Sequence, residues 1–272
     1  MNILYCADSG ICPGLMMSVL SLKNNTDREL HVYIITAELA YAGKGYDAIS
    51  PEFALKLERI LKRKNGGSSV TLINVGERFL KELPRANMDT RFTPMCMLRL
   101  FADEVDSIPD RILYLDCDVI CRRDFSEFYK TDLTGCHIAG VQDRYGRFLF
   151  SSPRNSFNYL NSGVLLMNMK KIREDGIFAK CRKLCREEKM FMPDQTALNR
   201  LAAKKKVPSM YNEQGKIKDD TVFKHFTTFF KFFPKFKAVT VKPWDVKRMH
   251  EVLGLYEFDG LISECRKEIK ND

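Results

Sequence analysis

The chain has 272 residues, of which 45% are hydrophobic and 29% charged, and its formal net charge at neutral pH is +9. This balance is typical of a soluble globular protein and excludes a disordered chain, a collagen and a disulfide-rich miniprotein. A chain of this length buries a large core, so its stability requires neither a metal nor a disulfide.

Short apolar stretches alternate with amphipathic ones along the whole chain, which predicts strands alternating with helices. We expect helices to begin near Pro13, Pro51 and Pro94, and two more to cover residues 172–189 and 194–205. The stretches expected to form strands are Ile3–Cys6, Val32–Ile35, Val70–Val75, Ile112–Leu115, Ile138–Val141, Gly163–Met169 and Val222–Phe226.

This order of elements predicts an α/β fold, with a mostly parallel, twisted sheet that carries helices on both faces. We expect one main domain over residues 1–250, and a helical tail over residues 251–272 that packs on it or extends from it. Ligands of such sheets bind beyond the carboxyl ends of the strands. Polar residues directly after an apolar strand are therefore the strongest site candidates.

Nine cysteines are scattered along the chain without the spacing of a zinc site. We interpret them as reduced and mostly buried, which predicts a cytoplasmic protein. The first residues lack the pattern of a signal peptide, and no apolar run approaches the ~20 residues that span a bilayer.

Positive charge is concentrated in the second half of the chain, where residues 170–206 hold 12 Lys and Arg against 5 Asp and Glu. Residues 221–248 hold 7 against 1. This concentration of positive charge predicts an anionic partner: a phosphate-bearing ligand, an anionic membrane face contacted peripherally, or nucleic acid. The alternative is a solvated surface that keeps the protein soluble.

Phenylalanines and lysines interleave over residues 223–237. Such a pattern can stack nucleic-acid bases or lie on an anionic membrane, although we expect most of these phenylalanines in the core. No RNP-like motif accompanies them, so nucleic-acid binding is a remote alternative. The chain also lacks G-x-G-x-x-G, Walker A, G-x-S-x-G and H-E-x-x-H motifs, which argues against the dehydrogenases, ATPases, hydrolases and zinc proteases that carry them.

Asp116 and Asp118 directly follow the apolar stretch Ile112–Leu115. Residues two apart in an extended chain point to one face, roughly 7 Å apart, so these carboxylates can hold one divalent cation between them. Oxygen ligands with open positions suit Mg²⁺ or Mn²⁺ carrying a substrate diphosphate. An acidic loop without a metal is the alternative.

Other polar residues near predicted strand ends have two interpretations each. Asp8 could bond a base or ribose, or cap the helix near Pro13. His225 could complete the cation site, since imidazole binds Mn²⁺ better than Mg²⁺, or could be a core histidine. Lys242 could meet a phosphate, and Trp244 could line the site or fill the core.

Two further segments could contact a sugar. Asn161 could bond a sugar hydroxyl, and Gly163 allows close approach of the backbone, but the same residues could form a turn. Asp194 and Gln195 begin a predicted helix, where they either cap it or face a sugar ring.

Taken in order, these segments resemble glycosyltransferase family 8, the retaining enzymes related to bacterial lipopolysaccharide galactosyl- and glucosyltransferases and to glycogenin. The resemblance runs from Ile3 to about Trp244. It implies a GT-A-type fold and a UDP-sugar donor bound through Mn²⁺, with Mg²⁺ as the alternative. The segments that carry it are Leu113-Tyr114-Leu115-Asp116-Cys117-Asp118, Asn161-Ser162-Gly163-Val164-Leu165-Leu166, Asp194-Gln195 and His225 with the later Lys242-Pro243-Trp244.

The resemblance also implies a role for each matching residue. Asp116, Asp118 and His225 would hold the metal, and Asp194 and Gln195 would be the catalytic residues. The residues implied at the nucleotide are Ala7, Asp8, Arg99, Asp116, Cys117 and Lys242. Those implied at the donor sugar are Asp143, Asn161, Ser162, Gly163, Asp194 and Gln195.

Some positions depart from the pattern that many family members share. Gly10 stands in place of an asparagine, and Thr228 in place of a glycine three residues after the histidine. The phosphate-binding lysine of the family matches Lys231 by its spacing from the histidine and Lys242 by its position before Pro-Trp. We favour Lys242 because it keeps the Pro-Trp context.

We therefore expect a metal-dependent retaining transferase that moves glucose or galactose from a UDP-sugar to a glycan or lipid-linked saccharide. Asp194 and Gln195 would stabilise oxocarbenium-like charge on the sugar. An amide is a poor nucleophile, so a same-face route aided by the donor phosphate is expected. The alternative from the same motifs is a nucleotide-sugar hydrolase or a nucleotide-sugar binder that transfers nothing.

Overall fold

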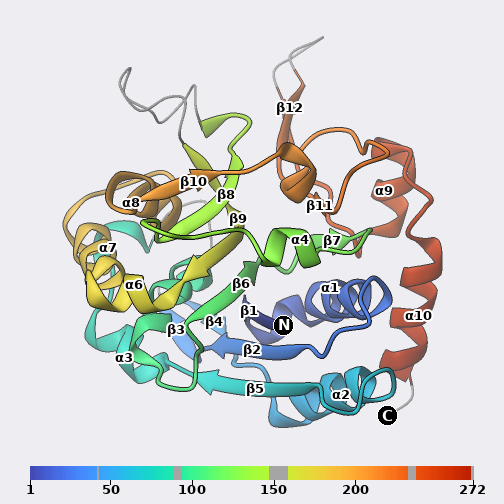
Figure 1. Ribbon diagram of the computed structural model, residues 1–272, viewed down its shortest axis with the longest axis horizontal. Helices are drawn as coiled ribbons and strands as arrows, with labels where there is room; N and C mark the ends of the chain where they lie inside the picture. Colours follow the sequence, from blue (N-terminus) through green and yellow to red (C-terminus); the bar gives the residue numbers. More distant parts are fainter. Residues whose placement is uncertain (42, 89–93, 147–158, 232–236, 271–272) are drawn as a thin grey trace.

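The computed structural model describes residues 1–41, 43–88, 94–146, 159–231 and 237–270. At its centre lies a seven-stranded sheet in the order β10-β8-β9-β6-β1-β2-β5 (Figure 1). Its strands are β1 (Asn2–Cys6), β2 (His31–Thr36), β5 (Ser69–Asn74), β6 (Arg111–Leu115), β8 (Ile138–Gln142), β9 (Leu160–Asn168) and β10 (Lys204–Lys206).

The sheet is mostly parallel, as the alternation of elements predicts. Strands β6, β1, β2 and β5 run parallel to one another, and β10 runs parallel to β8. Strand β9 is antiparallel to both of its neighbours, β6 and β8. The amino end of β9 therefore lies at the same sheet edge as the carboxyl ends of β6 and β1, which is the edge where ligands of such sheets bind.

Side chains alternate between two cores, one on each face of the sheet. Ile3 and Tyr5 of β1 point into one core, and Leu4 points into the other. Helices α1, α2, α9 and α10 contribute to the first core, and η3, α7 and α8 to the second. The expectation of helices on both faces is therefore confirmed.

The helices start and stop for local reasons. The Ser50 hydroxyl accepts a hydrogen bond from the backbone N–H of Phe53 and so caps α2, which begins at Pro51. The α-helices are α1 (Cys12–Asn24), α2 (Pro51–Lys62), α3 (Gly76–Lys81), α4 (Ser126–Tyr129), α6 (Met169–Glu174), α7 (Ile177–Glu187), α8 (Pro193–Leu201), α9 (Val246–Leu253) and α10 (Asp259–Lys270). The 3₁₀ helices are η1 (Ser9–Ile11), η2 (Arg85–Asn87), η3 (Pro94–Glu104) and η5 (Ser209–Asn212).

Some expected bounds are wrong. The helix expected over 172–189 is split because Gly176 adopts a left-handed backbone, with φ at 61°, between α6 and α7. The helix expected over 194–205 ends at Leu201, since residues 204–206 pair with β8. The strand expected from Gly163 begins at Leu160, so the polar residues before it belong to the strand and not to a turn.

Three short sheets complete the described fold: β3 (Leu39–Tyr41) with β4 (Lys44–Tyr46), β7 (Val119–Cys121) with β11 (Phe223–His225), and β12 (Phe229–Lys231) with β13 (Lys237–Val239). Helix α10 lies beside α1 (Figure 1), where Lys23 Nζ and Glu264 Oε1 form an ion pair at 2.7 Å. The boundary expected at residue 250 falls inside α9. No helix of the described residues is long and apolar enough to cross a membrane.

Candidate functional site

Two pairings between distant strands build the acidic end of the site. Asp116 follows β6, and its backbone N–H donates to the Gly163 carbonyl oxygen of β9 at 2.8 Å. Asp118 lies in the short link between β6 and β7. Strand β7 pairs with β11 in a register that sets His225 opposite Val119. His225 thereby reaches the two aspartates although it is far from them in the sequence.

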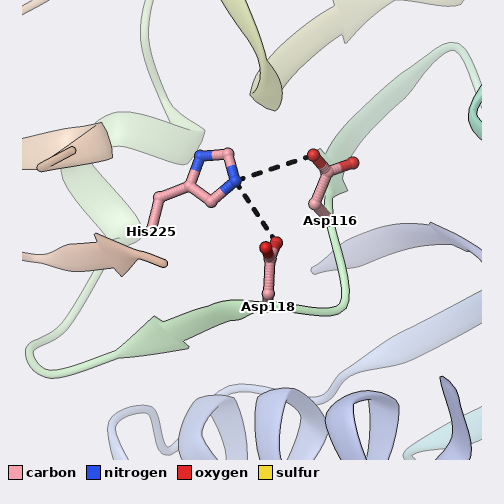
Figure 2. Close-up of side chains that lie close together, drawn as sticks. All are labelled: Asp116, Asp118 and His225. Carbon is pink, nitrogen blue, oxygen red and sulfur yellow. Dashed lines mark ion pairs between the residues drawn. The ribbon is translucent and has the colours of Figure 1, made fainter. Parts of the chain in front are cut away.

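The three expected metal ligands converge. His225 Nε2 lies 3.2 Å from Asp118 Oδ1 and 3.7 Å from Asp116 Oδ2, and Figure 2 shows the imidazole facing both carboxylates. One potential ligand atom from each residue falls within 4.8 Å of the others. Two carboxylates and one imidazole nitrogen form a donor set that suits Mn²⁺ and accommodates Mg²⁺. The residues therefore fit a divalent cation.

Neighbouring residues hold this triad in place. Gly163 is required here because a Cβ at that position would collide with the His225 ring and lie 2.7 Å from Asp116 Oδ2. Lys242 forms an ion pair with Asp118 Oδ2. Burial by itself would raise the pKa of the Asp118 carboxyl, but Lys242 and His225 hold that pKa well below its usual range. Asp118 is therefore ionised and ready to hold a cation.

Asn212 at the end of η5 was not a candidate from the sequence. Its side-chain oxygen lies 3.1 Å from His225 Nδ1, and its amide nitrogen donates to Asn161 Oδ1 at 2.9 Å. Asn161 Oδ1 also accepts the backbone N–H of Gly163, which fixes the orientation of both amides. The amide oxygen can only accept, so Nδ1 is the donor in this contact. The contact orients the ring so that its other nitrogen, Nε2, faces the two carboxylates.

The residues implied at the donor sugar form one hydrogen-bonded network. Gln195 Oε1 accepts the backbone N–H of Ser162 at 2.9 Å, and Gln195 Nε2 donates to Asp143 Oδ2 at 3.2 Å. Asn161 Nδ2 donates to the same Asp143 oxygen at 2.8 Å. Together with the metal triad, these side chains line a cavity of about 240 Å³, which we call the donor cavity.

Arg99 is buried beneath the donor cavity, with its side chain 2% exposed. Its guanidinium lies 3.1 Å from Asp116 Oδ1 and 3.1 Å from Asp194 Oδ2, and it donates to the Ser162 carbonyl oxygen at 2.6 Å. Burial raises the pKa of Asp194, and the arginine opposes that rise. Arg99 thus lies between Asp194 and the candidate metal site, and it donates to Asp116 Oδ1 and to the backbone carbonyl oxygens of Cys96 and Ser162.

A second cavity, of about 620 Å³, adjoins the donor cavity, and we call it the nucleotide cavity. The two share lining residues that include Asp116, Asp118 and Lys242. Ala7 and Asp8 line only the nucleotide cavity, which also has Cys117, Gly10 and Trp244 in its wall. All six residues implied at the nucleotide therefore border this space.

The other residues with two interpretations lie at different parts of the fold. Asp8 is the N-cap residue of η1, the 3₁₀ turn that leads directly into α1, and burial raises the pKa of its carboxyl. Lys242 lies at the triad, whereas Lys231 belongs to the β12–β13 pair. Of the interleaved aromatic residues, Phe223 and Phe226 are buried in the first core, Phe229 and Phe230 are partly buried, and those at 232, 233 and 236 lie outside the described residues.

The family model of glycosyl transferase family 8 matches residues 2–245, nearly the whole chain. The chain belongs to glycosyltransferase family 8. The family expected from the sequence is thereby confirmed.

Two relatives of the chain are named as glycosyltransferases. The lipopolysaccharide 1,2-glucosyltransferase of Escherichia coli K12 is 25% identical over 81% of this chain and 65% of its own. The glycosyltransferase GlyF of Streptococcus pneumoniae is 26% identical over 73% of this chain and 44% of its own, so the chain spans less than two thirds of either relative.

The fold of this family 8 protein is GT-A-type. The galactosyltransferase LgtC, solved in complex with donor and acceptor sugar analogs, superposes with a TM-score of 0.67 at 18% identity, over 98% of this chain and 96% of that chain. An active-site mutant of LgtC gives a TM-score of 0.70, also at 18% identity. Identity this low establishes the architecture, and the expected fold class is confirmed.

Proposed function

We propose that this family 8 protein is a metal-dependent retaining hexosyltransferase that moves glucose or galactose from a UDP-sugar to a glycan or lipid-linked saccharide. The observation that carries the proposal is the convergence of Asp116, Asp118 and His225 between the donor cavity and the nucleotide cavity. Lipopolysaccharide or other cell-surface glycan biosynthesis is the proposed setting, because a named relative is a lipopolysaccharide glucosyltransferase.

In the proposed reaction, the metal triad separates the two halves of the donor. Uridine would lie along Ala7 and Asp8, and the sugar would face Asp143, Asn161 and Gln195. A bound Mn²⁺ supplies a Lewis acid that stabilises charge on the departing UDP. The Lys242 ammonium lies at the same place, beside Asp118, and would pair with the diphosphate.

The catalytic pair would act on the sugar through electrostatics. The Asp194 carboxylate is buried in the first turn of α8 and lies near the Arg99 guanidinium. A carboxylate in this position stabilises positive charge that develops on the sugar ring. Gln195 Oε1 accepts hydrogen bonds from both the Ser162 N–H and its hydroxyl, and in this orientation we expect the amide to lie beside the ring. An amide is itself a poor nucleophile. We therefore propose a same-face displacement in which the acceptor hydroxyl oxygen bonds to the sugar carbon as the bond to UDP breaks, and the hydroxyl proton passes to the departing phosphate oxygen.

The decisive test replaces a metal ligand without changing its shape. We expect Asp118→Asn to lower Mn²⁺-dependent transfer from UDP-glucose or UDP-galactose by at least ~100-fold, because several kcal/mol of charge stabilisation are lost. The matched control is Asp106→Asn, an exposed aspartate outside both cavities that should keep wild-type activity. Transfer is followed as UDP release in the presence of an acceptor panel, with the anomer of the product assigned by NMR.

Three results of that assay would contradict the proposal. Full activity of Asp118→Asn would remove the metal role of the triad. A product of inverted configuration would exclude a retaining reaction. UDP release at the same rate with and without every acceptor would instead favour a nucleotide-sugar hydrolase.

A further inference from the structure

A third cavity, of about 590 Å³, opens beside the donor cavity, and we call it the basic cavity. The two share Tyr145, Gln214, Thr227 and Phe230 in their walls, so a molecule that enters one can extend into the other. The basic cavity shares no lining residue with the nucleotide cavity, which borders the donor cavity on the side of the metal triad. The basic cavity therefore borders the donor cavity at a part of its wall that the nucleotide cavity does not share, and a group bound there would be separated from the nucleotide.

The charged residues that line the basic cavity all carry the same sign. They are Arg144, Lys216 and Lys224, and none of the lining residues is acidic. Arg144 and Lys216 are exposed, whereas Lys224 is buried. Within the described ranges, none of the three forms an ion pair with a carboxylate.

Lys224 is the residue of the basic cavity that most favours the binding of an anion. Its ammonium donates to the Gly215 carbonyl oxygen at 2.6 Å, and a second backbone carbonyl, that of Glu213, lies at 3.4 Å. The Glu213 carboxylate is engaged at 3.2 Å by Lys218. Burial lowers the pKa of the Lys224 ammonium to about 8, and it outweighs the Glu213 carboxylate, which favours the charged form. An anion bound beside Lys224 in the basic cavity would therefore stabilise its charge.

The rest of the wall is apolar and aromatic. The Tyr145 and Phe230 rings meet edge to face with centroids 4.9 Å apart, and the Arg144 guanidinium lies 5.6 Å above the Tyr145 ring. Val252 and Leu253 of α9 contribute the opposite part of the lining. Aromatic faces beside cationic groups suit a sugar ring that carries an anionic substituent, because the ring's C–H face packs on the aromatic surface.

We infer that the basic cavity binds a phosphate or carboxylate substituent of the acceptor saccharide. This inference rests on the proposed transfer function and adds to it a class of acceptor, an anionic sugar. A membrane surface is the weaker candidate for the same positive charge, since a flat surface cannot reach the buried Lys224 inside a cavity.

The test compares a neutral sugar with its anionic relatives on the folded chain. Binding of glucose, glucose 6-phosphate and glucuronate is measured by calorimetry, with and without UDP and Mn²⁺. We expect an anionic sugar to bind at least tenfold more tightly than glucose, and the double variant Arg144→Gln, Lys216→Gln to remove that preference. The matched control is Lys130→Gln, Lys183→Gln, which removes the same charge from exposed positions outside the cavity and should keep the preference.

Further measurements distinguish an anionic acceptor sugar from the competing explanations for the positive charge. Equal affinity for glucose and both anionic sugars would overturn the inference, and so would inorganic phosphate binding as tightly as glucose 6-phosphate. Binding to phosphatidylglycerol vesicles that only the Arg144, Lys216 variant loses would assign the charge to a membrane instead. The preference for anionic sugars over glucose is also measured without nucleotide. Failure of UDP-glucose and UDP-galactose to bind would therefore count against the proposed function, whereas the sugar preference by itself would still test the basic cavity.

Discussion

Asn212 illustrates how much of the candidate metal site depends on a residue that touches no ligand. It is fully buried and carries a hydrogen-bonded chain from the His225 imidazole through Asn161 to the backbone of Gly163. Partners of this kind set the tautomer and the orientation of a ligating histidine. Asn212 is therefore a positioning residue for the proposed metal site.

Replacing Asn212 separates its hydrogen bond from its bulk. We expect Asn212→Leu to weaken Mn²⁺ binding by ~10–100-fold, because the Nδ1 proton of His225 loses its acceptor. Asn212→Asp keeps the acceptor oxygen for Nδ1 but loses the donor to Asn161 Oδ1, so it should weaken Mn²⁺ binding less than Asn212→Leu does. Titration calorimetry with Mn²⁺ measures both, and equal weakening in the two variants would show that Asn212 acts only through packing.

At the scale of elements, helix η2 holds the connection that leads into helix α8. Asn87 in η2 donates to the carbonyl oxygens of Cys185 and Glu188, at 2.6 and 2.7 Å, and accepts the backbone N–H of Met190 at 2.7 Å. One buried amide thus satisfies three backbone groups where α7 ends and the chain turns toward α8. The position of Asp194 depends on this clamp.

Removing the Asn87 side chain should lower the stability of the folded protein. We expect Asn87→Ala to lower the free energy of unfolding by ~2–4 kcal/mol, since it leaves buried backbone groups without partners. Arg85→Ala, an exposed change in the same short helix, should alter it by less than ~0.5 kcal/mol. Urea unfolding compares the two, and a loss for Asn87→Ala no larger than for Arg85→Ala would show that water replaces the amide.

For the whole molecule, the cavities meet at one edge of the central sheet. The carboxyl ends of β1 and β6 and the amino end of β9 converge there, and α8 adds Asp194 and Gln195 from the second face. A ligand that spans the donor and nucleotide cavities contacts elements from both halves of the chain. Binding should therefore stabilise the folded molecule as a unit.

A thermal-shift series measures this linkage. A ligand at 100 times its Kd adds about 2.7 kcal/mol, so saturating UDP-glucose or UDP-galactose with Mn²⁺ should raise Tm by ~5–10 °C. Omitting the metal, or introducing Asp118→Asn, should remove most of the rise. A shift that persists unchanged after chelation would mean that the nucleotide binds without a cation.

Local patterns indicated the alternation of strands and helices, and the resemblance of the motifs to glycosyltransferase family 8 implied the family and the GT-A-type fold. Burial on both faces of a parallel sheet leaves continuous apolar runs, and the Asp116–Asp118 pair directly follows one of them. Capping and proline signals likewise located the start of α2. These features act over a few neighbouring residues, so they can be found without the fold.

Only the tertiary structure decided which distant side chains meet. The pairing of β7 with β11 brought His225 to the aspartates, and the reversed direction of β9 placed the polar residues at its amino end at the site. Such contacts also determine the pairing of the charged edge strand β10, the hydrogen bond between Asn212 and His225, and the position of Lys242 at the triad. Pairing between segments far apart in the chain leaves no periodic pattern in either segment, because the contacts of each residue depend on which residues of the other segment lie opposite it. These contacts can therefore be identified only in the folded structure.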